Sequence, residues 1–211
     1  MIAPLIAALP FMTSTVARLV AFVIYVIAAL SDYFDGMLAR TRGLVTDLGG
    51  LLDPLADKLL LFATLIPMYI LMAPNNDRFA PTRMSLGSAH AFPFRTPWGE
   101  VGLPWWIVAI VIGRELFMTA FRHIAARKGV VISAIGPAKW KTGFQSVWVG
   151  AAYFWFFAAT YEQSVSGQST LWTSWAWFNG LAGVVSMIAA VVLTMYSLVL
   201  YIARYGRVIT G

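Results

Sequence analysis

Apolar residues run along this chain in long blocks that short polar segments separate. Five blocks are mostly apolar: Val16 to Leu30, Leu51 to Ala73, Leu103 to Thr119, Val147 to Thr160 and Ala176 to Ala203. A helix that crosses a bilayer needs about 20 such residues. A shorter apolar segment, Ile2 to Phe11, precedes the blocks. The pattern predicts an all-α, polytopic membrane protein with about six transmembrane helices.

The polar residues between the blocks set the expected helix ends. We expect long helices over about Val16 to Leu38, Gly50 to Ala73, Pro104 to Arg122, Lys139 to Thr160 and Ala176 to Arg204. The first segment is too short to span, so it lies in the membrane interface or continues residues upstream of the recorded start. The longest connection, residues 74 to 103, is rich in Pro, Gly, Asn and Ser and is expected to be an exposed outer loop. With no repeat in view, residues 1–211 are predicted to form one transmembrane domain.

Composition and charge support a membrane location. The chain is 60% hydrophobic and 11% charged, with a mean hydropathy of +0.75, whereas a soluble domain carries about 25% charged residues. The net charge is +6, and the basic residues flank the apolar blocks. That placement favours anionic lipid headgroups and phosphate substrates as partners, and not nucleic acid. The larger basic set predicts which ends face the cytoplasm, so the protein is expected in the cytoplasmic (inner) membrane.

Acidic residues gather in one short stretch, which predicts a metal site. Of the nine acidic residues, Asp32, Asp35, Asp47, Asp53 and Asp57 fall within it. Asp32 and Asp35 are three residues apart, and Asp53 and Asp57 are four apart, so each pair shares a helix face. Unpaired carboxylates at a membrane boundary repel one another and are costly to desolvate. A divalent cation resolves both costs, and ligation by oxygen alone favours Mg²⁺, Mn²⁺ or Ca²⁺.

Small residues between the aspartate pairs favour a nucleotide or diphosphate ligand. Gly36 and Ala39 leave room beside the first pair, and Gly49 leaves room before the second. Arg40 can donate two parallel hydrogen bonds to a phosphate. The aspartate stretch is therefore expected to bind a metal together with a phosphate-bearing ligand on the same, cytoplasmic side.

A basic set downstream predicts a second phosphate site. Arg114, Arg122, Lys139 and Lys141 fall near the same expected membrane face, and Arg114 and Glu115 interrupt an apolar block. A cation within an apolar helix is costly and usually faces a cavity or a partner. We interpret these four basic residues as a pocket for a phosphorylated acceptor. The competing interpretation is cytoplasmic anchoring plus a local polar patch of Arg114 and Glu115.

The aspartate stretch resembles a known signature. From Ser31 the chain reads SDYFDGMLARTRGLVTDLGGLLDPLADK. This fits D-x2-D-G-x2-A-R-x8-G-x3-D-x3-D, the pattern of the CDP-alcohol phosphotransferases, at every specified position. The segments LDPLADKLL, GREL from Gly113 and SAIGPAKWKTGFQ from Ser133 resemble the phosphatidylglycerophosphate synthase branch of that family.

The resemblance implies a reaction and a role for each aspartate. CDP-diacylglycerol and sn-glycerol 3-phosphate would give phosphatidylglycerol phosphate and CMP. Asp32, Asp35, Asp53 and Asp57 would hold Mg²⁺ or Mn²⁺, and Asp57 would also be the general base for the acceptor hydroxyl. Asp32 would help bind the donor. A homodimer, surrounded by membrane lipids, is a further implication of the resemblance.

The same resemblance implies how the two substrates are held. The donor nucleotide would lie against the small residues named above, with Arg40 on its phosphates. The four basic residues downstream would hold the acceptor phosphate.

Other functions stay open at this point. A relative with another acceptor, such as phosphatidylglycerol, inositol phosphate or serine, would share the aspartates. An intramembrane prenyltransferase also uses aspartate pairs and Mg²⁺, but it normally separates its two motifs by far more chain. A divalent cation transporter would place carboxylates near the middle of the membrane, whereas here they fall at helix ends.

Overall fold

The computed structural model describes residues 2–42, 47–72, 92–130, 136–164 and 170–206. Within the helices, the side chains of residues 32, 33, 35–42, 47–55, 137–139 and 163–164 lie outside the description. The elements are α1 (Ala3–Ala8), η1 (Leu9–Phe11), α2 (Thr15–Arg42), α3 (Asp47–Met72), β1 (Phe94–Thr96), β2 (Gly99–Val101), α5 (Trp105–Arg127), α6 (Gly136–Ser164) and α7 (Thr170–Tyr205).

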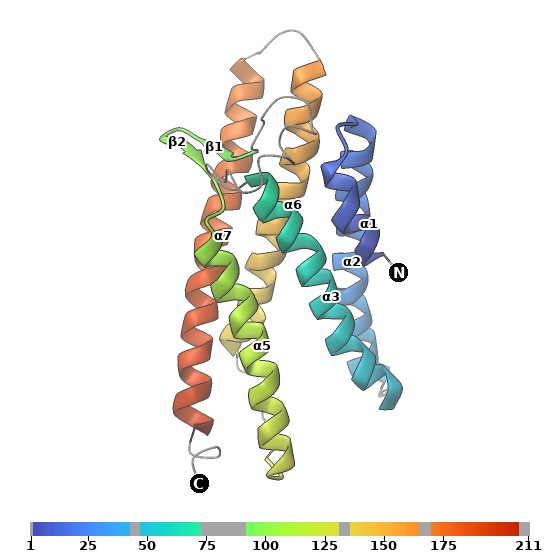
Figure 1. The fold of residues 1–211 in the computed structure, drawn as a ribbon, viewed down its shortest axis with the longest axis vertical. Helices are drawn as coiled ribbons and strands as arrows, with labels where there is room; N and C mark the ends of the chain where they lie inside the picture. Colours follow the sequence, from blue (N-terminus) through green and yellow to red (C-terminus); the bar gives the residue numbers. More distant parts are fainter. Residues whose placement is uncertain (1, 43–46, 73–91, 131–135, 165–169, 207–211) are drawn as a thin grey trace.

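The described chain is mostly helical, and its long helices run up and down one bundle. α2, α5 and α7 descend in Figure 1, while α3 and α6 ascend. The carboxyl ends of α2, α5 and α7 therefore lie at the same end of the bundle as the amino ends of α3 and α6. This lower end carries both the aspartate stretch and the basic set, although they are far apart in sequence.

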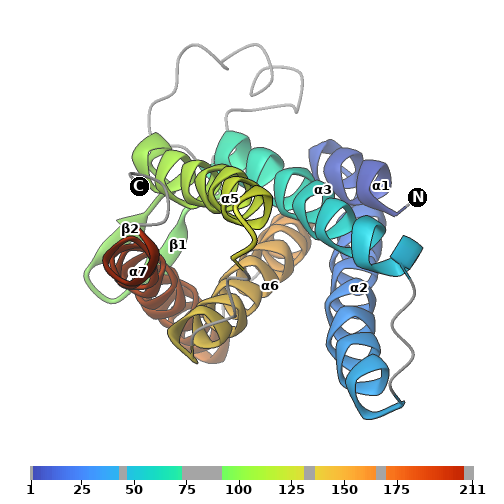
Figure 2. The same cartoon turned by 90° about the horizontal axis from the view of Figure 1, so that it is seen from below.

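Helix α6 forms the centre of the core. Trp148, Tyr153, Trp155 and Phe156 on α6 are each no more than 2% exposed. Viewed from below in Figure 2, α6 lies between α2 and α7. Large aromatic side chains at this position fill the space between the neighbouring helices, so α6 fixes the spacing of the bundle.

The N-terminal segment folds back onto the bundle. Ile6 of α1 is fully buried, and the hydroxyl of Tyr153 donates to its carbonyl oxygen at 3.2 Å. The first turn of α2 is fixed by Arg18, which is 3% exposed. Its guanidinium donates to the Pro10 carbonyl oxygen at 3.1 Å and to the Thr160 hydroxyl. The segment thus packs against the helices, and its position in the membrane interface stays a prediction.

The exposed outer loop expected over residues 74 to 103 is wrong for its second half. β1 and β2 form an antiparallel hairpin there, with Phe94 opposite Val101. Phe94 and Leu103 are fully buried. The backbone N–H groups of Phe92 and Leu103 donate to the last carbonyls of α3, those of Leu71 and Met72, at 2.7 and 3.1 Å. The hairpin therefore caps α3 and belongs to the core.

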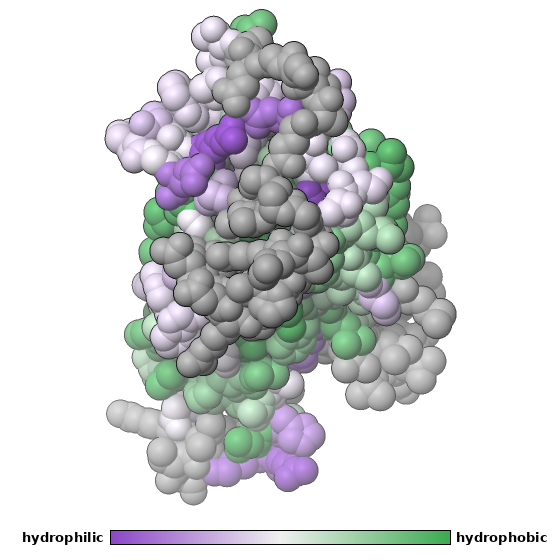
Figure 3. Space-filling model, turned by 45° about the horizontal axis from the view of Figure 1, so that its top comes forward, coloured by the Kyte–Doolittle hydropathy of each residue, from purple (hydrophilic) through white to green (hydrophobic). Residues whose placement is uncertain are grey.

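The surface agrees with a membrane environment, while the number of spans stays a prediction. Within the described residues, α7 is the one helix long and apolar enough to cross a bilayer, and Thr15–Ser31 is a shorter apolar segment. Phe178, Val185 and Val192 of α7 are large apolar side chains that are more than half exposed. Figure 3 shows hydrophobic residues over the middle of the described surface and hydrophilic residues towards its two ends. Exposed apolar surface of this kind marks contact with lipid or with protein.

Candidate active site

The aspartate stretch spans the lower ends of two consecutive helices. Positions 32 and 35 belong to α2 and position 53 to α3. Their side chains, with those of Gly36, Ala39, Arg40 and Gly49, lie outside the described part of the structure. Asp57 is described and is exposed. The linking segment, residues 43–46, can span at most roughly 18 Å, so the two helix ends stay near each other.

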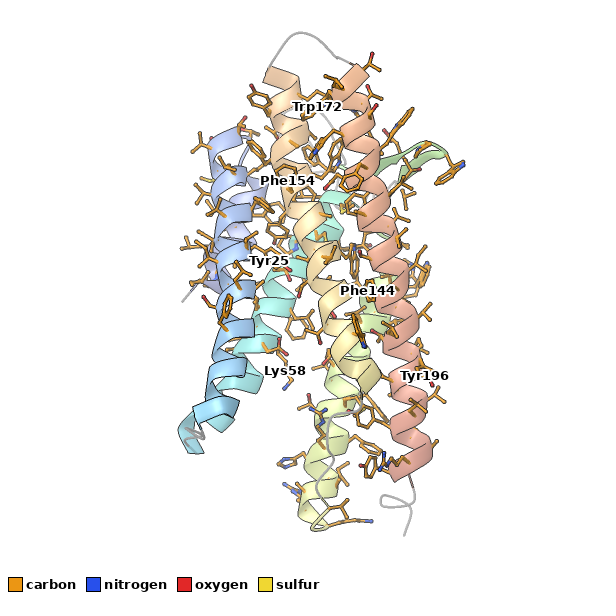
Figure 4. The ribbon with its side chains drawn as sticks, turned by 180° about the vertical axis from the view of Figure 1, so that it is seen from behind. Tyr25, Lys58, Phe144, Phe154, Trp172 and Tyr196 are labelled. Atoms are coloured by element: carbon orange, nitrogen blue, oxygen red, sulfur yellow. The ribbon has the colours of Figure 1, made fainter. Side chains whose placement is uncertain are left out.

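A cavity of about 70 Å³ lies beside Asp57 and is lined by α2, α3 and α6. Asp57 and Thr64 line it from α3, and Tyr25 lines it from α2. Gln145 and Ser146 line it from α6. Figure 4 shows Tyr25 above the level of Lys58, the neighbour of Asp57, so the cavity extends from the carboxylate towards the middle of the bundle.

At the inner end of the cavity, the hydroxyl groups of Tyr25 and Thr64 already have hydrogen-bond partners. The Tyr25 hydroxyl donates to the Ser146 carbonyl oxygen at 2.9 Å. The Thr64 hydroxyl bonds to the carbonyl oxygens of Leu60 and Leu61 at 2.9 and 3.0 Å. These bonds join α2 to α6 and fix the Thr64 side chain against its own helix.

A second cluster joins the lower halves of α5, α6 and α7. Glu115 on α5 accepts a hydrogen bond from Arg114 at 2.8 Å and another from Lys141 on α6. Both donors bond to the same oxygen, Oε1. Arg114 also donates to the Ser197 hydroxyl on α7 at 3.1 Å. The cluster thus brings together Arg114 and Lys141, which are separated by 26 intervening positions in the sequence.

The hydrogen-bond donors of this cluster are not all satisfied. Arg114 is 7% exposed and Lys141 is 5% exposed; the two share the carboxylate of Glu115, and the negative charge of Asp57 also acts on Lys141. The Nε atom of Arg114 has no hydrogen-bond partner among the described residues. A buried cation is stable only when it is paired and its donors are satisfied. The arrangement is therefore suited to receive an additional anion.

The other two predicted basic residues stand apart from this cluster. Arg122 is exposed and lies over the ring of Tyr201 at 5.9 Å. It follows Arg114 by two turns of α5, about 12 Å along the axis. The side chain of Lys139 lies outside the described residues. The sequence pattern paired Glu115 with Arg114 alone. The spacing of residues did not indicate that Glu115 also contacts Lys141 or that Ser197 bonds to Arg114.

The described side chains include no group of three or more His, Cys, Asp or Glu residues that could hold a metal. Three of the four predicted ligands, Asp32, Asp35 and Asp53, are outside that description. The chemistry of the donor set is what fits a metal: four carboxylates supply hard oxygen ligands, which Mg²⁺ and Mn²⁺ prefer.

Comparison with known protein families identifies the class. A family model described as CDP-alcohol phosphatidyltransferase matches residues 1–203. The chain therefore belongs to the CDP-alcohol phosphatidyltransferase family, and the protein is a phosphatidyltransferase. This membership sets aside the prenyltransferase and the cation transporter.

Three individual relatives are similar to the chain over much of its length. The chain is 32% identical to the "Probable phosphatidylglycerophosphate synthase" of Mycobacterium tuberculosis over 195 residues, 92% of this chain and 70% of the relative. It is 33% identical to the "CDP-diacylglycerol--glycerol-3-phosphate 3-phosphatidyltransferase" of Bacillus subtilis over 136 residues, 64% of this chain and 55% of the relative. It is 28% identical to the "Cardiolipin synthase (CMP-forming)" of Oryza sativa subsp. japonica over 190 residues, 88% of this chain and 48% of the relative.

Proposed function

We propose that the protein transfers the phosphatidyl group of CDP-diacylglycerol to sn-glycerol 3-phosphate, giving phosphatidylglycerol phosphate and CMP. The observation that carries the proposal is the pair of buried cations, Arg114 and Lys141, with one carboxylate between them. Two buried cations, one of them with an unpartnered Nε donor, favour an acceptor that bears a phosphate group. The names of the Mycobacterium and Bacillus relatives support the same acceptor.

Asp57 is the proposed general base. The hydroxyl oxygen of the acceptor attacks the phosphorus that carries diacylglycerol. A new phosphorus–oxygen bond forms while the bond to the bridging oxygen of the diphosphate breaks, and CMP leaves with that oxygen and its electron pair. Asp57 takes the proton of the hydroxyl and later releases it to water. Its place in the cavity wall puts it next to a space that an alcohol can enter.

The donor is proposed to lie against the aspartate stretch. Asp32, Asp35, Asp53 and Asp57 would hold Mg²⁺ or Mn²⁺, which neutralises charge on the diphosphate when bound. By helical register, position 32 follows Ala29 by three and position 53 precedes Asp57 by four, so both fall on faces that line the cavity. Asp32 would also contact the donor.

Small residues and one arginine complete the proposed donor site. Gly36, Ala39 and Gly49 would leave space for the nucleotide, and Arg40 would contact its phosphates. On the acceptor side, Lys139 and Arg122 are proposed to assist the buried cations, Lys139 from the first turn of α6 and Arg122 from the end of α5.

An acceptor panel tests the proposal. The purified protein is supplied with CDP-diacylglycerol, Mg²⁺ and one acceptor at a time: sn-glycerol 3-phosphate, phosphatidylglycerol, inositol phosphate or serine. Release of CMP is measured. The proposal expects sn-glycerol 3-phosphate to give the highest kcat/KM by at least about tenfold, the value of one charge-assisted hydrogen bond. Equal or faster release with another acceptor would refute it.

Phosphatidylglycerol is the second candidate acceptor, because the rice relative is named cardiolipin synthase. Its headgroup phosphate is a diester with one charge, whereas a phosphate monoester carries nearly two. The two buried cations beside Glu115 therefore favour the monoester. The acceptor panel separates the two candidates, since each gives a different lipid product.

The proposed setting is the cytoplasmic membrane, with about six helices of one domain, residues 1–211, and the lower end of the bundle facing the cytoplasm. The chain has no cysteine, so single cysteines can report sidedness. Trp98→Cys on the hairpin turn should be labelled by a membrane-impermeant maleimide from outside, and Lys128→Cys at the end of α5 only after lysis. The opposite pattern would reverse the orientation. The proposed homodimer is tested separately by the mass of the detergent-solubilised protein.

A further inference from the structure

The cavity beside Asp57 has polar groups that the proposed chemistry leaves unused. Gln145 and Ser146 contribute to its wall from α6. Gln145 is half-buried and carries an amide, which offers two donors and one acceptor. The Tyr25 and Thr64 hydroxyls are engaged with backbone carbonyl oxygens at the inner end. A ligand in the cavity therefore meets Asp57 on one wall and the Gln145 amide on another.

Gln145 also stands close to the cation cluster. It follows Lys141 by four residues on α6, so the two share a helix face with their Cβ atoms about 5–6 Å apart. A molecule whose phosphate contacts Lys141 can thus extend a short carbon chain past Gln145 towards Asp57. The charge of Asp57 acts on Lys141, so the two side chains are near enough for a short acceptor with a phosphate at one end and a hydroxyl at the other.

The cavity has a volume of about 70 Å³ and is open on one side. A three-carbon polyol can therefore enter it beside Gln145.

We propose that this cavity is the subsite for the polyol part of the acceptor, and that Gln145 recognises the secondary hydroxyl of a three-carbon polyol phosphate. The amide of Gln145 hydrogen-bonds the hydroxyl that does not react, which turns the primary hydroxyl towards Asp57. This inference rests on the proposed function and adds the residue that distinguishes a polyol phosphate from a simple hydroxyalkyl phosphate.

The test compares sn-glycerol 3-phosphate with 1,3-propanediol monophosphate, which lacks the secondary hydroxyl, by CMP release from CDP-diacylglycerol. A neutral hydrogen bond corresponds to a preference of about fivefold, so the native protein should favour glycerol phosphate by about that factor in kcat/KM. Gln145→Met keeps the length of the side chain and removes the amide. It should lower kcat/KM for glycerol phosphate to the value for propanediol phosphate. The value for propanediol phosphate should stay within about twofold of that of the native protein.

The control is Val147→Met, at an exposed position of the same helix, and it should preserve the native preference. If Gln145→Met fails to fold, Gln145→Ala is measured with the same acceptors. If Gln145→Met kept the native preference, or lost activity equally with both acceptors, the role of Gln145 would be overturned and the proposed function would stand. A different outcome is that the native protein turns over neither phosphate and yet turns over another alcohol. That result would overturn the proposed function and this subsite with it.

Discussion

Lys141 on α6 donates a hydrogen bond to the carboxylate of Glu115 on α5, which is already bonded to Arg114. Through this contact one carboxylate holds two cations that are each at least nine-tenths buried. Without a counter-charge the cations would repel each other in a poorly solvated site. Glu115 therefore keeps the proposed acceptor pocket assembled while no acceptor is bound.

Replacing Glu115 by Gln should destabilise the empty protein. Breaking a buried ion pair by removing one partner costs about 3–5 kcal/mol, so the melting temperature in detergent should fall clearly. Saturating sn-glycerol 3-phosphate supplies new negative charge and should raise the melting temperature of Glu115→Gln more than that of the native protein.

Glu100→Gln is the control for this change. Glu100 is exposed on β2. Surface substitutions usually change stability by about 0.5 kcal/mol or less, so the control should melt near the native temperature. An equal loss in the two variants would show that the pair with Lys141 has no special importance.

Asp57→Asn should abolish turnover and leave binding of CDP-diacylglycerol in the presence of metal largely intact. The amide cannot accept the proton of the acceptor hydroxyl, while three further carboxylates remain for the metal. CMP release measures the first effect, and equilibrium binding of labelled donor measures the second. Near-normal turnover would remove Asp57 from the role of base.

The buried cations should act on the acceptor. Loss of a charge-assisted hydrogen bond costs about 1.5–3 kcal/mol, so Lys141→Met and Arg114→Met should each raise the acceptor KM at least about tenfold. The donor KM should stay within about twofold. Arg127→Met, at the exposed end of α5, is the control. A rise in the donor KM alone would place these residues on the other substrate.

Metal removal should stop the reaction. A chelator is expected to reduce CMP release to background, because four carboxylates then lack the cation that screens them and the diphosphate. Addition of Mg²⁺ or Mn²⁺ in excess should restore it. Full activity in the chelator would contradict the role proposed for the aspartates.

The sequence predicted the long helices because their apolar blocks are continuous. The helix expected from Pro104 to Arg122 is α5, Trp105–Arg127, and the helix expected from Lys139 to Thr160 is α6, Gly136–Ser164. Both observed helices extend beyond the ends expected from the sequence, because polar side chains in the last turns leave the backbone hydrogen bonds of a helix intact. The link between Glu115 and Lys141 was not predictable, since it depends on how α5 packs beside α6.

The hairpin was missed for a related reason. Its strands have three residues each, too few for a clear alternation of polar and apolar positions. The one local feature is the turn between the strands. In the structure, the Thr96 hydroxyl donates to the Gly99 carbonyl oxygen there at 2.7 Å. What buries the hairpin is distant in sequence: Gly180 and Gly183 on α7 leave space for it.

Gly180→Ala should therefore weaken the docking of the hairpin. A Cβ atom at Gly180 would lie 1.9 Å from the Arg95 carbonyl oxygen, which belongs to the backbone and cannot swing away. Overpacking of this kind costs about 1–3 kcal/mol, so the melting temperature should fall. Gly143→Ala on α6 is the control, because a Cβ there meets nothing within 4 Å. Alanine favours a helix over glycine by about 0.5–1 kcal/mol, so the control should melt at or above the native temperature. If Gly180→Ala melted as high as Gly143→Ala, the hairpin would not be held against α7 as the structure has it.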